Sequence, residues 1–220
     1  MKTHIILAAE RLFAERGLDG ASLRQISAAA GNGNNTAVQY HFGTKDRLVQ
    51  AIFEYRLRDL NERREALVAE LRPHALRTWV QCHIVPVLEQ GERAGSHYLT
   101  FVAKLHQHGR SDVLGRLSPE LLAPTRQFRE EVGALLPHLP EPLRGHRLGH
   151  AVVHAVQAGS EREQSRARDE QVLPFAVHVG DLLDGLVGFL EAPVSAETRA
   201  ALDAAEAPAR QELHPPLIHP

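Results

Sequence analysis

The chain has 220 residues, enough for one small and one larger domain with a real hydrophobic core. Its net charge of −2 argues on its own against a nucleic-acid partner, and its single cysteine, Cys82, excludes an intramolecular disulfide. The sequence has no apolar run of 18 residues and no signal peptide, so we expect a cytoplasmic protein without a membrane-spanning helix.

The charge is distributed unevenly along the sequence. Residues 1–64 hold ten Lys and Arg against seven Asp and Glu, a net of +3, whereas the remaining residues hold 15 against 20, a net of −5. A mildly basic head on an acidic body points toward DNA binding by the N-terminal part.

A first short helix pattern begins at Ser22 and ends at Gly31. Ser22 is a good N-cap, and Gln25 three positions later completes a capping box. Leu23 and Ile26 lie at helical spacing and predict a buried face. Gly31 can take the left-handed conformation that closes a helix.

A second short helix pattern follows after a tight Asn/Gly turn, with Asn34 or Asn35 as its cap. Val38 and Phe42 are four residues apart, so both can dock on the core, while Asn35 and Gln39 lie on another face. Two short helices joined by a Gly-containing turn, the second rich in polar side chains, are typical of a DNA-binding helix-turn-helix. A solvated polar helix is the alternative.

Apolar residues recur at helical spacing through the rest of the chain, and no hairpin signal appears, so we expect an all-α protein. Pro73 should end the first of the later helices, and Pro86 should kink or end the second. Residues 206–220, with four prolines, are expected to be a disordered tail. The expected helices cover about 44–71, 76–90, 96–106, 118–136, 143–168, 173–190 and 195–205.

Residues 5–56 resemble the N-terminal domain of TetR (tetracycline-repressor) family transcriptional regulators. The family usually reads LFAERG, TSVRDIAAAAGVS, LYHHF and SKEAL where this chain reads LFAERG, ASLRQISAAAGNG, VQYHF and TKDRL. The chain departs from the family in a turn that is one residue longer and in Gln39, which replaces a usual Tyr. The resemblance implies a three-helix DNA-binding domain over 1–48 and a larger helical domain for ligand binding and dimerisation over 49–205.

The same resemblance assigns roles in binding double-stranded DNA. Arg24 would reach a base edge, and the recognition-helix positions around Gln39 would face the major groove of a pseudo-palindromic operator. Lys45 would meet a phosphate in the first turn of its helix, where backbone N–H groups also point. The candidate DNA-binding residues are Ser22, Arg24, Asn34, Asn35, Thr36, Ala37, Gln39, Tyr40, His41 and Lys45.

The helix expected over 173–190 has an apolar arc that covers nearly half of its circumference, so it must bury against more than one neighbour. A deep core helix and a dimer interface both fit this pattern. The family dimerises through its last two large helices, and two operator half-sites need a two-fold axis, so we favour a homodimer. The candidate interface residues are Val152, Val156, Val179, Leu182, Leu183, Leu186, Phe189 and Leu190.

The resemblance also implies a repressor that responds to an unknown small ligand held in a mostly apolar cavity. Each candidate for its lining is equally compatible with plain core packing. Two other functions stay open: a ligand-independent DNA-binding protein with a filled core, and a helical enzyme or carrier that contains a helix-turn-helix-like pair. The candidate lining residues are Trp79, His83, Tyr98, Phe101, Val102, His106, Leu122 and Phe128.

Other sites have weaker support. His146, His150 and His154 are spaced four apart and could share a metal, but no nearby cysteine or carboxylate completes the set. Cys82 is interpreted as a buried structural thiol rather than a nucleophile. We therefore predict no metal site, no cofactor and no catalytic residue.

Overall fold

The computed structural model describes residues 2–31 and 36–211. Within them it contains helices and no strand, which confirms the prediction of an all-α protein. None of these helices is long and apolar enough to cross a membrane. In chain order the elements are α1 (Lys2–Gly20), α2 (Leu23–Ala29), α3 (Thr36–His41), α4 (Lys45–Leu71), α5 (Leu76–Glu92), α6 (Tyr98–Gln107), the 3-10 helix η1 (Ser111–Arg116), α7 (Pro119–Ala134), α8 (Glu141–Ala167), α9 (Phe175–Glu191) and α10 (Ala196–Gln211).

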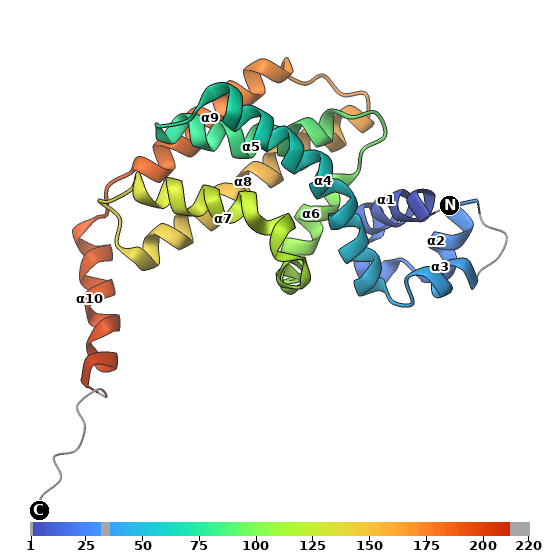
Figure 1. Ribbon diagram of the computed structural model, residues 1–220, viewed down its shortest axis with the longest axis horizontal. Coiled ribbons are helices and arrows are strands. Elements are labelled where there is room, and N and C mark those ends of the chain that lie inside the picture. Colours follow the sequence, from blue (N-terminus) through green and yellow to red (C-terminus); the bar gives the residue numbers. More distant parts are fainter. Residues whose placement is uncertain (1, 32–35, 212–220) are drawn as a thin grey trace, which may run out of the picture.

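Helices α1, α2 and α3 gather around the start of α4 and form a small N-terminal head (Figure 1). Its core contains Ile5, Phe13, Ile26, Val38 and Leu48, each at most 1 % exposed. These side chains come from all four helices, and α3 is held in this core mainly through its contacts with α2.

The predicted ends of α2 are confirmed. Ser22 Oγ accepts a hydrogen bond from the Gln25 backbone N–H at 3.2 Å, and Gln25 Oε1 accepts one from the Ser22 N–H at 2.8 Å. Gly31 has a φ of +73°, the left-handed conformation expected after the helix. Asn34 and Asn35, the predicted caps of the next helix, lie outside the described residues.

Helix α4 connects the head to the rest of the molecule as one continuous element of 27 residues. Thr44 begins it by accepting a hydrogen bond from the Arg47 N–H at 3.2 Å, and Arg72, with a φ of 45°, ends it. Pro73 follows directly, which confirms the predicted end of this helix. Figure 1 shows α4 running from the head into the larger body.

In the body, α5, α7, α8 and α9 enclose a second core, in which Trp79, Ile84, Leu148 and Leu186 are buried, while α6 packs on the first core. Pro86 does not end α5, which continues to Glu92, so of the two expectations for this proline the helix end is wrong. Burial of α5 against α4, α8 and α9 outweighs the one backbone hydrogen bond that a proline removes.

Helix α10 projects away from the body (Figure 1). It continues to Gln211, so the segment expected to be a disordered tail from residue 206 begins as helix. Residues 212–220 lie outside the described part of the chain. The frequent Ala, Glu and Arg residues of α10 favour helix, and the helix continues through Pro208.

Candidate functional site

The outer surface of α2 and α3 is polar and exposed. Arg24 and Gln39 are exposed, and Tyr40 is 86 % exposed, while Val38 on the opposite side of α3 is fully buried. His41 is half-buried, and its ring meets the Tyr40 ring edge-on at 5.2 Å. The head core therefore fixes the backbone of α3 and leaves these polar side chains available to a groove of DNA.

Four of the candidate DNA-binding residues are only partly described or not described. Asn34 and Asn35 fall outside the described residues. Thr36 and Ala37 belong to α3, and their side chains lie outside the described part of the structure. Ser22 is exposed, and its hydroxyl is engaged in capping α2.

Lys45 has a partner within the head. Its Nζ donates a hydrogen bond to the Leu18 carbonyl at 2.7 Å, just after the break in α1 at Gly17. An ammonium group has three donors, so one bond to Leu18 leaves two for a phosphate. Its neighbour Asp46 pairs with Arg110 at 2.8 Å, which lowers the pKa of the Asp46 carboxyl.

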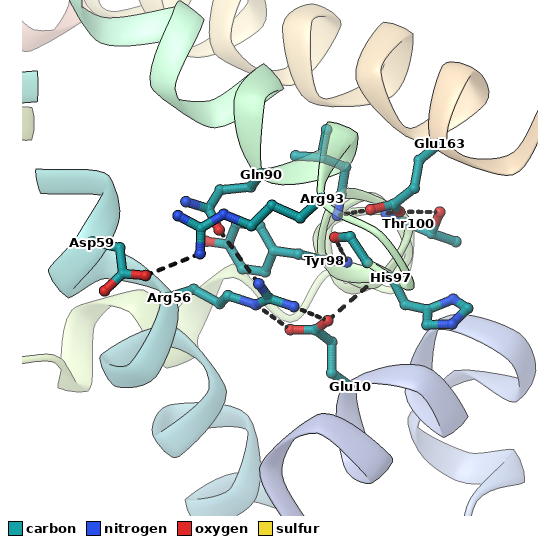
Figure 2. A network of polar contacts seen from close by, with 11 residues as sticks. Glu10, Arg56, Asp59, Gln90, Arg93, His97, Tyr98, Thr100 and Glu163 are labelled. Carbon is teal, nitrogen blue, oxygen red and sulfur yellow. Dashed lines mark hydrogen bonds and ion pairs between the residues drawn. The ribbon is translucent and has the colours of Figure 1, made fainter. Parts of the chain in front are cut away.

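A buried ion pair joins the head to the body (Figure 2). Arg56 of α4 donates from Nε and Nη2 to both carboxylate oxygens of Glu10 in α1, at 2.7 and 2.6 Å. Arg56 also reaches Gln90 of α5 at 3.4 Å, and its guanidinium lies 5.6 Å from the Tyr98 ring centroid. The Glu10 hydrogen bond raises the pKa of Arg56 against the opposing effect of burial.

Helix α6 begins at this ion pair and is held there by two carboxylates. Glu10 accepts a hydrogen bond from the His97 N–H at 3.4 Å. Glu163 of α8 accepts from the Thr100 N–H and hydroxyl at 2.8 and 2.7 Å (Figure 2). Two anions at a helix N-terminus satisfy its free N–H groups and its positive dipole. The start of α6 is therefore tied to the head through α1 and to the body through α8.

A cavity of about 200 Å³ lies among α4, α5 and α7, and we call it the Arg64 cavity. Three of the predicted lining residues, Trp79, His83 and Phe128, belong to it. The His83 and Phe128 rings stack at 4.0 Å with an interplanar angle of 7°. The full lining is Arg64, Glu65, Val68, Ala69, Trp79, Cys82, His83, Pro124, Gln127 and Phe128.

A smaller cavity of about 130 Å³ lies along α4, α6 and α8. It contains two further predicted lining residues, Val102 and His106. Val152 and Val156, which were expected at a dimer interface, also line it. Five of the eight predicted lining residues are therefore divided between two separate cavities.

The remaining candidates for the ligand cavity have other positions. Tyr98 and Phe101 are buried in the core that joins the head to α6, where Phe101 packs 5.6 Å from Phe53 and 6.2 Å from Phe13, centroid to centroid. Leu122 is half-buried against the same core. Helical spacing identified these side chains as apolar and inward-facing, but it could not tell core packing from a cavity wall.

The candidate dimer residues of α9 have two kinds of position. Leu182, Leu183, Leu186 and Leu190 are at most 7 % exposed within one chain, because α9 packs against α5 and α8. Phe189 is 42 % exposed, and Val179 is half-buried. Val177, which the sequence analysis passed over, is 52 % exposed on the same helix.

The histidine repeat of α8 forms no metal cluster among the described residues. His150 and His154 are exposed, and the His146 and His150 rings lie 4.1 Å apart. Cys82 is buried, as interpreted from the sequence, and burial raises the pKa of its thiol. A raised thiol pKa disfavours the reactive thiolate.

The sequence of the head matches a known protein family. Residues 5–52 match the family model described as bacterial regulatory proteins, tetR family. No curated protein matches the chain.

Solved structures share the fold of most of the chain. A transcriptional regulator from Rhodococcus sp. Rha1 is 21 % identical, covers 86 % of this chain and 95 % of its own, and superposes with a TM-score of 0.55. A protein from Clostridium perfringens assigned to the regulation of fatty acid metabolism is 15 % identical over 87 % of this chain and 100 % of its own, with a TM-score of 0.55. A protein from Mesorhizobium loti assigned to the TetR family is 18 % identical over 86 % and 94 %, with a TM-score of 0.51. At these identities the likeness concerns the fold.

Proposed function

Since the chain belongs, through residues 5–52, to the tetR family of bacterial regulatory proteins, we propose that it is a homodimeric, DNA-binding transcriptional repressor that a small ligand releases from its operator. Its head would bind one half of a pseudo-palindromic site through α2 and α3. The partner's head would bind the other half, about 34 Å away.

The observation that carries this proposal is the single continuous helix between the two sites. Helix α4 begins at Thr44, next to the recognition helix, and supplies Arg64, Glu65, Val68 and Ala69 to the wall of the Arg64 cavity. A helix of 27 residues is about 40 Å long. A tilt of its axis that shifts the cavity end slightly therefore displaces the head, at the other end, by a comparable or larger distance. A ligand that prefers one tilt would thereby change the spacing of the two heads.

The proposed dimer would use the outer faces of α8 and α9. Phe189 and Val177 are exposed large apolar side chains on α9, and apolar surface that a single chain leaves uncovered favours association. The four buried leucines of α9 would support this face from behind as part of the chain's own core. This moves the proposed contact from the leucines to the outward side of the same helix.

Selection of bound duplexes from a random DNA library tests the proposal. We expect a pseudo-palindrome with half-sites one helical turn apart, bound by a protein that sediments as a dimer. Gln39→Ala should cost about 1–3 kcal/mol of operator affinity and relax the preference at one position. Glu62→Ala, an exposed change on α4 away from the head, is the control.

Small molecules added to the protein–operator complex test the response to ligand. The proposal is supported if at least one compound releases the protein from its operator. Substitutions in the lining of a body cavity should then change the affinity for that compound. A protein that binds its operator specifically but responds to no compound is a ligand-independent DNA-binding protein. A monomer without sequence preference would contradict the proposal as a whole.

A further inference from the structure

The Arg64 cavity contains a buried cation without an anionic partner. Arg64 is 6 % exposed, and its guanidinium donates only to neutral groups. Nε donates to the His83 carbonyl at 3.2 Å, Nη1 to Asn61 Oδ1 at 3.3 Å, and Nη2 to His83 Nε2 at 3.2 Å. No described carboxylate forms an ion pair with it, and Glu65, the acidic residue in the lining, is exposed.

An uncompensated buried charge is costly, because the protein interior solvates it less well than water. Burial lowers the pKa of Arg64 to about 10, so the group is still protonated at neutral pH. The hydrogen bonds to neutral acceptors satisfy N–H donors of the guanidinium, but they do not balance its positive charge. The structure thus holds a positively charged group in a fixed position at the wall of the cavity.

His83 helps to hold the Arg64 guanidinium in a fixed orientation. A guanidinium has no acceptor, so in its contact with Arg64 Nη2 the His83 Nε2 atom must be the acceptor. The proton of the neutral ring then lies on Nδ1. No described residue accepts a hydrogen bond from that N–H. Burial, together with the nearby Arg64 and Arg129, holds the pKa of His83 well below its usual range, so the ring stays neutral.

The rest of the lining is mostly apolar. Trp79, Phe128, Val68 and Pro124 provide aromatic and aliphatic walls. The volume of about 200 Å³ is below the about 300–1,000 Å³ of pockets for drug-sized ligands, so it suits a compact molecule. An anionic end and an apolar body are the two features that such a site can recognise together.

We propose that the Arg64 cavity binds a small apolar carboxylic acid, with its carboxylate on the Arg64 guanidinium and its hydrocarbon part against Trp79 and Phe128. This inference rests on the ligand-responsive function proposed above and names the class of its effector. Because Arg64 belongs to α4, the ligand's charge acts directly on the helix that carries the head.

The chain contains its own optical probe for this test. Trp79 is the only tryptophan, and it lines the cavity, so a bound molecule changes the whole tryptophan emission of the protein. Benzoate and hexanoate are the anionic probes, and benzamide and hexanamide are neutral probes of the same size. The variants are Arg64→Gln, which removes the charge, and Arg64→Lys, which keeps a charge without the planar fork. Arg63→Gln, a neighbouring change at an exposed residue outside the lining, is the matched control.

We expect the acids to change Trp79 emission and the amides to bind at least tenfold more weakly. Arg64→Gln should weaken binding of the acids by on the order of 10- to 100-fold, as for the loss of a charge-assisted hydrogen bond, and leave the amides unchanged. Arg64→Lys should fall between, and Arg63→Gln should match the wild type. Thermal unfolding without ligand, monitored by circular dichroism, verifies that each variant is folded.

Three results would overturn the inference. Equal binding of acid and amide, or unchanged acid binding by folded Arg64→Gln, would show that Arg64 does not select an anion. Failure of every probe to bind would do the same. Operator release measured with the same compounds separates this outcome from the function: release by amides alone keeps the ligand-responsive repressor without the anion site, and acid binding without release keeps the site and refutes the response.

Discussion

Arg56 and Arg64 lie eight residues apart on the same face of α4, and each is 6 % exposed, but their surroundings differ. At the junction of the head and the body, which we call the hinge, Arg56 forms two short hydrogen bonds with Glu10. The Glu10 carboxylate thereby neutralises the charge of Arg56 inside the chain. In the Arg64 cavity, Arg64 contacts only neutral groups. The two arginines are therefore equally buried but differ in their charge balance. Glu10 balances the charge of Arg56, whereas no described carboxylate pairs with Arg64.

The largest effect should come from breaking the completed pair. Arg56→Met leaves the Glu10 carboxylate buried without its cation, which should lower the free energy of unfolding by about 3–5 kcal/mol. Urea unfolding measures this. Arg11→Met breaks only an exposed contact with Glu15 at 4.0 Å, and it should change stability by less than about 0.5 kcal/mol. Similar losses in both variants would refute the special role of the hinge pair.

The close packing of α8 on α5 and α6 should also tolerate added volume poorly. A Cβ atom at Gly159 of α8 would lie 2.6 Å from Leu99 Cδ1 and 2.9 Å from Leu88 Cδ2, so Gly159→Ala should cost about 1–3 kcal/mol. Gly149→Ala on the same helix meets nothing within 4 Å and should gain up to about 1 kcal/mol from helix propensity. Thermal melting of the two variants, compared in one buffer, tests the difference, and equal shifts would argue against close packing at α6.

Acid should act on the cavity through His83. Its pKa in the folded chain is depressed from about 6.5, so the unfolded chain binds the proton more readily. Its contribution is fully present above pH 6.5 and is lost as the pH falls below that value, with a slope of at most about 1.4 kcal/mol per pH unit. His83→Gln should flatten the stability profile between pH 6.5 and 5, and His74→Gln, at an exposed site, should leave it unchanged. An unaltered profile in His83→Gln would contradict the buried neutral ring.

The smallest effect should come from removing the unbalanced charge. Arg64→Met relieves the cost of burying a guanidinium and gives up its hydrogen bonds to His83 and Asn61, so the two changes should nearly cancel. We expect a free energy of unfolding within about 1 kcal/mol of the wild type, measured beside Arg56→Met in urea. A loss as large as that of Arg56→Met would mean that Arg64 is balanced within the chain after all.

Local chemistry made much of the fold predictable. The capping of α2 by Ser22 and Gln25 involves residues three apart, and the end of α4 before Pro73 depends on adjacent ones. The inward side of α9 was also evident from helical spacing. What covers that side was not, because Leu183 and Leu186 meet residues of α5 and α8 that are distant in the sequence.

The charged groups of the site illustrate the same limit. Ile52, Arg56, Leu60 and Arg64 recur every four residues, so two arginines interrupt an otherwise apolar face of α4. That spacing is a signal for buried charge that helical periodicity of apolar residues alone does not reveal. Even so, the spacing could not have told the two arginines apart, because Glu10 lies 46 residues from Arg56 along the chain.

The Glu10–Arg56 pair has a consequence for building chimeric regulators. A head grafted at the predicted boundary after residue 48 would take Glu10 from one parent and Arg56 from the other. Unless both parents carry this pair, the hybrid would enclose a lone carboxylate or a lone guanidinium at its junction. Joining the two halves after Arg56 keeps the pair within one parent, and it leaves only the weaker contacts with Gln90 and His97 to be matched.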